Sequence, residues 1–357
     1  MAGFRGIIRD EGLLPMMIDY IRNGDFYFHK FIAKEDFQQG KIIASGAGGK
    51  IFECDWNGNH VVVKQCADQG ILFSSKEEIR MEVALMSIFS HPNVLYCLGA
   101  NLRAKYPYFL MPRANYCLEY LILGDEENNL QIPLPFGVRY SFAHQIALGM
   151  GYIHTWKIIH RDLKSANILV NEDFRCYITD FGISRLSDKN RMTLNLGTIS
   201  WMAPELFKGD GHYTEAVDVY SFGVLLWELA ARKRPHVDCE SWSIPDQVIR
   251  GLRPTIPPSC PPEFTEIINS CWRKNPAKRP TFSQLAVQFK ELCSTNEIPP
   301  NYSMSELLAK MNAKPAELPP SSPQVGSDGM FPSSLSSSTA KARAHIGHQR
   351  SNKLSSM

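Results

Sequence analysis

The chain has 357 residues, of which 44% are hydrophobic and 21% charged, and its formal net charge is only +2. These values are typical of a globular protein, and the near balance of charge gives no reason to expect a nucleic-acid partner. The nine cysteines are odd in number and contain no CxxC pair. This pattern favours reduced thiols in a cytoplasmic or nuclear protein over a disulfide framework or a zinc site. We find no secretory signal, and apolar runs are far shorter than the roughly 18 residues that span a membrane.

Three zones differ in composition. Residues 1–35 form an N-terminal extension, with enough apolar residues between 13 and 21 for a short helix. Residues 36–296 read as one continuous globular domain. Residues 297–357 are rich in Ser and Pro, and we expect a disordered tail because they bury too little apolar surface to offset the entropy of ordering. Within this tail, residues 302–311 are amphipathic enough to pack back onto the domain.

The first part of the domain predicts strands. Residues 41–65 contain three β-rich runs separated by turns, and Asn57-Gly58-Asn59 is a hairpin signal. Residues 74–89 then favour a helix, because Ile79, Val83 and Met86 recur every three or four residues.

The later part of the domain predicts helices. Residues 138–154 place Phe142, Ile146 and Met150 one turn apart. Residues 216–230 are apolar on nearly all sides, which is typical of a helix buried in a core. Residues 124–131 are polar and indicate an insertion before the first of these helices.

Three short motifs follow one another in the second half of the chain. They are His160-Arg161-Asp162-Leu163-Lys164-Ser165-Ala166-Asn167, Asp180-Phe181-Gly182 and Ala203-Pro204-Glu205. A Gly-rich turn, a lysine that ends an apolar strand and a helix bearing glutamates precede them. In this order and spacing, the chain resembles the protein kinase family over about residues 36–296. The resemblance implies an α+β, two-lobed fold, with a β-rich N-lobe at about 36–111 and a helical C-lobe at about 115–296.

Phosphoryl transfer needs positioned reactants and neutralised oxygen charge. By resemblance, Asp162 accepts the proton of the substrate hydroxyl, and Lys164 neutralises the phosphoryl group in transit. Asn167 and Asp180 supply oxygen ligands for Mg²⁺, with Mn²⁺ as an alternative. The implied co-substrate is ATP.

A lysine and a glutamate complete the expected catalytic set. Lys64 closes the strand Val61-Val62-Val63, and the resemblance implies that it reaches the α- and β-phosphates. Its expected ion-pair partner by register is Glu82, with Glu78 about one turn earlier as the second choice.

Other motif residues have expected structural roles. The resemblance places His160 near Phe181, without a role as a base. It pairs Glu205 with Arg279, and it assigns Asp218 to anchoring the backbone of the loop that carries Asp162.

The Gly-rich loop departs from the family pattern. Ala44 stands where the first glycine is usual, and Gly48 replaces the usual aromatic residue. Gly46 and Gly49 remain and let the backbone approach phosphates. These changes predict weaker ATP binding, but they remove no charged group. The nucleotide-binding residues implied by the resemblance are Ile43, Gly46, Gly49, Ile51, Val62, Lys64, Met111 and Leu169.

The position of the adenine ring is less well defined by the sequence. Val62 is expected above the ring and Leu169 below it. Pro112 breaks the family register, so the gatekeeper is either Leu110 or Met111, and hinge hydrogen bonds are expected from about 111–113.

Two residues favour serine or threonine as the acceptor. Lys164 is typical of Ser/Thr kinases, and Thr198 matches the threonine that hydrogen-bonds the catalytic aspartate and lysine and so positions the substrate. The Trp201-Met202 pair and residues 218–229 resemble the tyrosine-kinase-like group, whose members mostly phosphorylate Ser or Thr. Dual specificity remains an alternative.

The resemblance also implies regulation. Arg161 precedes the catalytic aspartate, a feature associated with activation-loop phosphorylation, because a phosphate would neutralise the basic pocket around it. We expect Thr193 as the modified residue, with Ser187 as the second choice.

A second class of function is a pseudokinase or scaffold with weak nucleotide binding. A pure scaffold has no physical need for Lys64, Asp162, Asn167 and Asp180, so their presence favours the enzyme. The expected partners are protein substrates and ATP, with neither nucleic acid nor a membrane span. The sequence gives no expectation for the oligomeric state.

Overall fold

The computed structural model describes residues 30–46, 49–66, 76–124, 130–180, 196–208, 213–298 and 302–304, and all of these belong to one compact unit, Met1–Pro323. Several predicted features lie outside the described residues. They are the helix expected between 13 and 21, residues Gly48, Phe181, Ser187 and Thr193, most of the polar insertion, and all of the tail except 297–298 and 302–304.

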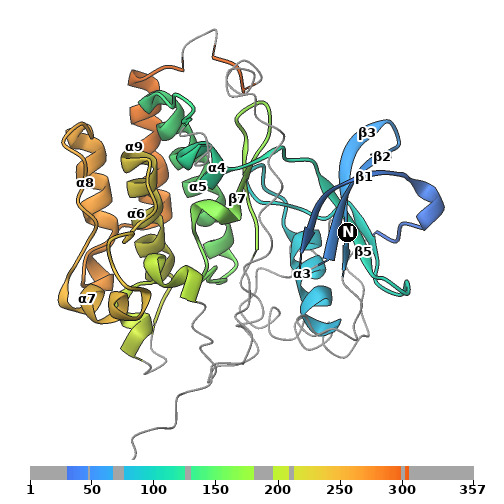
Figure 1. The fold of residues 1–357 in the computed structure, drawn as a ribbon, viewed down its shortest axis with the longest axis horizontal. Helices are drawn as coiled ribbons and strands as arrows, with labels where there is room; N and C mark the ends of the chain where they lie inside the picture. The colour runs from blue at the N-terminus through green and yellow to red at the C-terminus, as the bar shows by residue number, and fades with distance from the viewer. Residues whose placement is uncertain are drawn as a thin grey trace, which may run out of the picture. The chain divides into compact units, whose positions relative to one another are not determined.

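A five-stranded antiparallel sheet forms the first half of the domain (Figure 1). Its order is β1-β2-β3-β5-β4. The three predicted strands and the hairpin are confirmed, since Asn57 and Gly58 both adopt the positive φ that this tight turn requires. The strands are β1 (Gln38–Gly46), β2 (Gly49–Trp56), β3 (Asn59–Cys66), β4 (Gly99–Asn101) and β5 (Tyr108–Pro112).

The two faces of the sheet bury different side chains. Alternation along β3 places Val62 in the main core and Val63 in a separate cluster. Helix α3 (Lys76–Ile88) contributes Val83 and Met86 to the main core, and Figure 1 shows it beside the sheet. The predicted helix is therefore confirmed, and its apolar stripe joins the sheet.

Residues 30–37, which we call the outer strap, pack into the second cluster. Ile32 and Phe37 are buried there with Val63 and Tyr108. Ile32 N donates to the carbonyl of Ala100 at 3.2 Å, and the Tyr108 hydroxyl donates to the carbonyl of Ile32 at 3.0 Å. The end of the N-terminal extension is thus part of the packed domain.

The described residues of the second half include six α-helices, and Figure 1 shows α5, α6, α8 and α9 gathered together. Helix α6 is buried at every residue from Val217 to Ala230 because its sequence has no polar face. The predicted helices at 138–154 and 216–230 are confirmed. The helices are α4 (Leu118–Leu123), α5 (Phe136–Thr155), α6 (Ala216–Ala231), α7 (Ile244–Arg250), α8 (Pro262–Cys271) and α9 (Phe282–Thr295).

A small sheet lies within this helical half. Its strands are β6 (Tyr116–Cys117), β7 (Ile168–Val170) and β8 (Cys176–Ile178), in that order. β7 begins directly after Asn167, and β8 ends two residues before Asp180. The pairing of these two strands therefore sets the positions of both residues. The whole is the two-lobed α+β architecture that the resemblance implies.

The C-terminal end of α3 is anchored to the helical half. The amide of Asn93 donates to Gln145 Oε1 at 3.0 Å and to the carbonyl of Cys176 at 3.1 Å. The Ile178 N–H donates to the Asn93 carbonyl at 3.0 Å. Gly149 is required beside this contact, because a Cβ there would lie 2.8 Å from the same carbonyl. The loop after α3 is therefore bonded directly to the helical half.

Residues beyond 296 also contact the domain. Met304 is buried in the main core, and the ring of Tyr302 lies 5.3 Å from that of Phe174. The Tyr302 hydroxyl donates to the carbonyl of Pro133. These contacts agree with the expected packing of 302–311 for the three residues that are described.

Candidate active site

Helix α6 hydrogen-bonds the loop from His160 to Asn167. Asp218, fully buried in that helix, accepts hydrogen bonds from the N–H groups of His160 and Arg161, both at 2.8 Å. Arg161 has a φ of 65°, a left-handed conformation that is unfavourable for a residue with a side chain. The paired bonds to Asp218 stabilise this conformation, which is the anchoring role expected for Asp218.

Asp162 is fixed by its neighbours on the same loop. The amide nitrogen of Asn167 donates to the Asp162 carbonyl at 2.7 Å and to its Oδ2 at 3.0 Å. Lys164 Nζ lies 3.3 Å from the same Oδ2. Among the described residues, no hydrogen-bond partner reaches Asp162 Oδ1, although this atom is buried. A buried acceptor without a partner is costly, so this oxygen suits an incoming hydroxyl group.

Thr198 extends this group from another segment. Its hydroxyl accepts a hydrogen bond from Lys164 Nζ at 3.0 Å, and both side chains are buried. Lys164 therefore bridges Thr198 and Asp162. The expected contact of Thr198 with the lysine is present, whereas its link to Asp162 runs through Lys164.

Lys64 lies on β3 and faces α3 across the main core. Its Nζ is 3.0 Å from Glu82 Oε1, and the two side chains are 25% and 28% exposed. Burial by itself lowers the pKa of Lys64, but the Glu82 carboxylate and the more distant Asp180 outweigh it and raise the pKa to about 12. The structure thus favours Glu82, the register-based choice, over Glu78 as the partner of Lys64.

Asp180 follows β8 and has a φ of 56°. The Asp180 side chain is exposed at the surface of the site. Protein atoms nevertheless surround its carboxylate and displace water from it, and this desolvation is the main cause of the raised pKa of Asp180. The negative charges of Asp162 and Glu82 raise the pKa further. A cation placed beside these carboxylates would relieve that repulsion.

The described residues contain no group of three or more His, Cys, Asp or Glu side chains that could hold a metal by themselves. Asn167 uses its amide nitrogen on Asp162, which leaves its side-chain oxygen for a ligand. One amide oxygen and one carboxylate agree with Mg²⁺, which commonly keeps water and phosphate oxygens in its shell.

The residues of β3 and β5 that we expect to contact the nucleotide lie on one face of the sheet. Val62 pairs with Met111 and Lys64 with Phe109 across β3 and β5. Leu110 points to the other face, where it is buried with Val63 and the outer strap. Of the two gatekeeper candidates, only Met111 therefore lies on the face of Lys64.

Other expected nucleotide-binding residues surround this face. Ile43, Ile51 and Leu169 are half-buried and pack against the main core. Gly46 pairs with Gly49 at the end of the β1–β2 ladder, and Gly49 has a φ of 124°, which favours glycine. The altered loop tip between them lies outside the described part of the chain.

The expected regulatory residues are only partly within the described ranges. The Arg161 guanidinium lies 5.1 Å from the ring of Tyr213, while Thr193 and Ser187 fall outside. The ring of His160 contacts the Thr179 carbonyl at 2.9 Å.

The pair expected between Glu205 and Arg279 is present. The guanidinium binds both carboxylate oxygens, at 2.5 and 2.9 Å. Arg279 also lies over the ring of buried Tyr220 at 5.2 Å, so this pair ties the end of the third motif to α6.

The sequence reasoning missed Glu228. This fully buried residue of α6 has Oε1 2.7 Å from Ser165 Oγ and Oε2 2.7 Å from Trp201 Nε1. Burial raises the pKa of the Glu228 carboxyl to about 8. The available signal was a second acidic residue, besides Asp218, inside a mainly apolar helix, because such a residue is rarely buried without partners.

This geometry is that of a phosphoryl-transfer site on a two-lobed fold, and comparison with known proteins agrees. A profile of the family "Protein tyrosine and serine/threonine kinase" matches residues 37–289. The chain belongs to this protein kinase family.

The relatives are named serine/threonine-protein kinases. A probable LIM domain-containing serine/threonine-protein kinase of Dictyostelium discoideum is 42% identical over 272 residues, covering 75% of this chain and 40% of that protein. An RGS domain-containing serine/threonine-protein kinase A of the same organism is 36% identical over 286 residues, covering 79% and 25%. A putative serine/threonine-protein kinase/receptor of Acanthamoeba polyphaga mimivirus is 34% identical over 263 residues, covering 72% and 15%. The chain thus spans two fifths or less of the length of these relatives.

Within the described ranges, no helix combines the length and apolar character needed to cross a membrane.

Proposed function

We propose that the protein is a serine/threonine-protein kinase that transfers the γ-phosphate of ATP to hydroxyl groups of protein substrates. The observation that carries this proposal is the position of Lys164. Its ammonium lies between Asp162 Oδ2 at 3.3 Å and Thr198 Oγ1 at 3.0 Å. The other carboxylate oxygen, Asp162 Oδ1, is buried and has no hydrogen-bond partner within the described part of the chain. The Asp162 carboxylate can accept a hydroxyl proton, and the adjacent Lys164 ammonium can neutralise negative charge.

Each side chain of the site then has a role in the proposed reaction. Asp162 orients the substrate hydroxyl through Oδ1 and takes its proton as the bond to phosphorus forms. Lys164 offsets the negative charge next to Asp162, and Lys64, held by Glu82, orients the phosphates. Mg²⁺ bound by Asn167 and Asp180 would neutralise negative charge on the phosphate oxygens.

Serine or threonine specificity is supported by Lys164 and Thr198 and by the names of the relatives. Dual specificity is the alternative that product analysis distinguishes. The proposed switch is phosphorylation of Thr193, with Ser187 second, opposite Arg161. The proposed partners are protein substrates, and the buried, unpaired cysteines support a reducing compartment such as the cytoplasm.

The hinge offers few donors for an adenine ring. Pro112 has no amide hydrogen, so the donors proposed beyond the gatekeeper Met111 come from Arg113 or Ala114. Together with Ala44 and Gly48, this supports weaker ATP binding than a complete Gly-rich loop would give.

The test is transfer of labelled phosphate from ATP by the purified protein, compared with Asp162→Asn. We expect the variant to lose activity by at least about 100-fold, because it cannot accept the proton. Equal thermal unfolding of the two proteins would show that the fold is intact. Equal incorporation by both would favour the scaffold function, and phosphotyrosine in the product would contradict strict Ser/Thr specificity.

Regulation is tested separately by Thr193→Ala. Lower activity in this variant, together with loss of activity after phosphatase treatment of the unmodified protein, is the expected result. Unchanged activity in both experiments would contradict the switch.

A further inference from the structure

Two arginines of the helical half lie close to the hydroxyl group of Tyr302. All three side chains donate to the backbone carbonyls of residues 132–134. Arg232 donates to the first of these carbonyls at 2.9 Å, and Arg139 donates to the third at 2.6 Å. The Tyr302 hydroxyl donates to the middle one, that of Pro133. This short run of backbone therefore brings the hydroxyl and both guanidinium groups into one small region.

The two guanidinium groups have no acidic partner among the described residues. Burial and, to a smaller extent, the positive charge of Arg139 lower the pKa of Arg232 to about 10. Burial also raises the pKa of Tyr302 to about 12, and the charges of Arg232 and Arg139 oppose this rise. Two neighbouring cations without a counter-charge favour the binding of an anion. Their remaining hydrogen bonds go to the backbone carbonyls of Leu121, Ile122, Leu229 and Ala230.

Each guanidinium keeps one terminal nitrogen that donates to no described residue. This nitrogen is Nη2 in Arg139 and Nη1 in Arg232. Neither nitrogen is buried without a partner, so both are open to solvent. Arginine donates strong, charge-assisted hydrogen bonds to phosphate. Because the backbone carbonyls already orient both guanidinium groups, binding a phosphate would cost little side-chain entropy.

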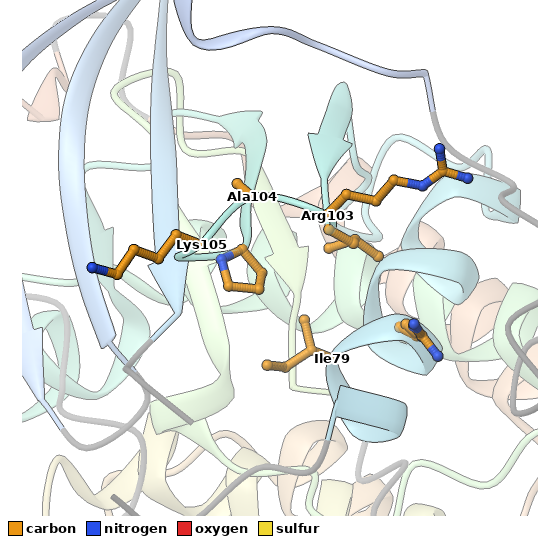
Figure 2. A pocket seen from close by; sticks show the side chains of 7 residues that line it. Ile79, Arg103, Ala104 and Lys105 are labelled. Atoms are coloured by element: carbon orange, nitrogen blue, oxygen red, sulfur yellow. The ribbon is translucent and has the colours of Figure 1, made fainter. Parts of the chain in front are cut away.

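Other basic side chains of the domain lie in a different environment. Figure 2 shows Arg103 and Lys105 on the loop between β4 and β5, and both are exposed. Water and salt screen such cations effectively. Arg139 and Arg232 are half-buried, and an ion pair is stronger where protein displaces water. An anion therefore gains more from this pair than from exposed cations.

We propose that Tyr302 is a phosphorylation site and that Arg139 and Arg232 bind its phosphate, which holds residues 302–304 against the helical half. The phosphate donor is ATP, and the catalyst is a protein-tyrosine kinase. The O–H bond of Tyr302 breaks, its oxygen bonds to the γ-phosphorus, and ADP leaves with the bridging oxygen. The proton passes to a base of that kinase. Tyr302 is half-buried and its acceptor Pro133 is exposed, so the hydroxyl lies near the surface.

Phosphorylation changes the bonds that Tyr302 makes. It removes the neutral hydrogen bond to Pro133, and the two free guanidinium nitrogens can then bind the phosphate oxygens. Charge-assisted hydrogen bonds are roughly twice as strong as neutral ones. We therefore expect the phosphate to stabilise the segment in place and not to release it.

The segment also contacts the turn between β7 and β8. The ring of Tyr302 lies 5.3 Å from that of Phe174 in this turn, and Met304 is buried in the main core. β7 begins directly after Asn167, and β8 ends two residues before Asp180. Phosphorylation would therefore stabilise the turn that connects the two proposed metal ligands.

The phosphate itself is the first probe. Phosphotyrosine is introduced at position 302 of the full chain by nonsense suppression, and its phosphate is titrated by ³¹P NMR. The second pKa of such a phosphate is ordinarily about 6. Because guanidinium groups favour the dianion, we expect this pKa to be lower by at least about 1 in the folded protein than in the same protein unfolded in urea. Equal pKa values in both states would overturn the proposal.

Variants of the modified protein identify the binding groups. Arg139→Gln and Arg232→Gln each remove one charge, and we expect each to reduce the difference between folded and unfolded pKa values by about half. Lys233→Gln removes an exposed cation next to Arg232 and should leave the difference unchanged. If neither arginine variant changes the difference, these side chains do not bind the phosphate. Because two separate variants are used, misfolding of one leaves the other as the test.

Hydrogen exchange measures whether the segment is stabilised. We expect the amides of residues 297–304 and 171–175 to exchange at least about threefold more slowly in the full chain with phosphotyrosine than in the unmodified chain. Faster exchange of residues 297–304 would show that the phosphate expels the segment. That result would overturn the proposed hold, as would equal exchange.

Access to Tyr302 is tested with a tyrosine kinase that modifies the free peptide 297–309 in the presence of ATP. Its substrate is the full chain carrying Asp162→Asn, so the activity of this protein does not contribute. We expect Tyr302 to be modified in the native chain, and buried Tyr140 and Tyr220 only after unfolding. Modification of the peptide but not of the native chain would contradict the assignment. None of these measurements depends on the proposed kinase function, so the two proposals fail independently.

Discussion

At the scale of single residues, Glu228 holds two segments of the active site together. Ser165 belongs to the loop that carries Asp162 and Lys164, while Trp201 belongs to the segment that carries Thr198. Both contact the same carboxyl group at 2.7 Å. Lys164 and Thr198 also contact each other. The two segments are therefore joined twice, once by this hydrogen bond and once by the buried carboxyl of Glu228.

The raised pKa of Glu228 predicts a pH-dependent stability. The pKa of this carboxyl is about 8 in the folded protein, above the ordinary glutamate value of 4.5, so the carboxyl releases its proton more readily in the unfolded chain. Its stabilising effect is therefore fully present below pH of about 4.5 and is lost as pH rises towards about 8. Glu228→Gln stays neutral, so we expect the difference in free energy of unfolding between variant and unmodified protein to shift by more than about 1 kcal/mol over this window.

Urea denaturation at several pH values between 5 and 8 measures this shift. Glu291→Gln, on the exposed face of α9, is the matched control and is expected to follow the unmodified protein. Parallel curves for Glu228→Gln and the unmodified protein would contradict the prediction.

Thr198 offers a prediction about catalysis. Thr198→Val keeps the shape of the side chain but removes the oxygen that accepts the bond from Lys164. A hydrogen bond to a charged group contributes about 1.5–3 kcal/mol, so we expect kcat/KM to fall roughly tenfold to a hundredfold. Thr198→Ser retains the oxygen and should stay within about threefold of the unmodified enzyme. A loss of similar size in both variants would show that the methyl group, not the hydroxyl, matters.

At the scale of elements, the outer strap depends on one glycine of β4. A Cβ at Gly99 would lie 2.4 Å from the Cδ1 of Ile32 and 2.8 Å from the carbonyl of Lys30. Both distances are shorter than real Cβ contacts allow. The close packing of the outer strap against β4 is therefore possible only with glycine at this position.

We expect Gly99→Ala to lower the free energy of unfolding by about 1–3 kcal/mol, because the strap must shift. Ile32→Ala alone loses buried apolar surface and should cost about 2–4 kcal/mol. In the double variant the shorter side chain relieves part of the clash, so the combined loss should be smaller than the sum by at least about 0.5 kcal/mol. Chemical denaturation of the four proteins gives these values, and strict additivity would show that Gly99 and Ile32 do not interact.

The elements themselves could largely be predicted from local sequence. The run of valines in β3 and the three- to four-residue spacing in α3 and α5 are local signals, and the structure contains all of these elements. The outer strap could not be predicted, because the burial of Ile32 depends on Gly99, which is distant in the sequence. The gatekeeper also stayed open, since Pro112 obscured the register, and only the pairing of Val62 with Met111 shows which side chain faces Lys64.

In the active site, too, some residues could be recognised from local sequence and others could not. Lys64, Asp162, Asn167 and Asp180 come from short motifs, so their positions in the chain were readable before their distances were known. Glu228 was not, because nothing in α6 indicates that its partners lie in two other segments. Its contacts arise only when three distant parts of the chain meet.

At the scale of the whole molecule, the cysteines are packed thiols. All nine are free, and six of them are buried. Burial raises the pKa of Cys66, Cys117 and Cys271 to about 12. At pH 8 such a thiol is only about one part in ten thousand thiolate, the reactive form.

We therefore expect a thiol reagent at pH 8 to modify the native protein mainly at half-buried Cys239 and Cys293, and all nine cysteines only after unfolding. Mass spectrometry after short exposure counts the labels. Rapid labelling of Cys66 or Cys271 in the native protein would show that the surrounding core opens far more often than its packing suggests.

The outer strap has one more consequence. β4 is the last strand of its sheet, and an uncovered last strand is a template on which a second chain can pair. In this protein Ile32 and Lys30 take up the hydrogen bonds of Ala100 at 3.2 and 2.8 Å. A fragment cut at residue 37, where the family profile begins, would expose both these backbone groups and the apolar surface under Ile32. We therefore expect the outer strap to limit self-association as well as to complete the core.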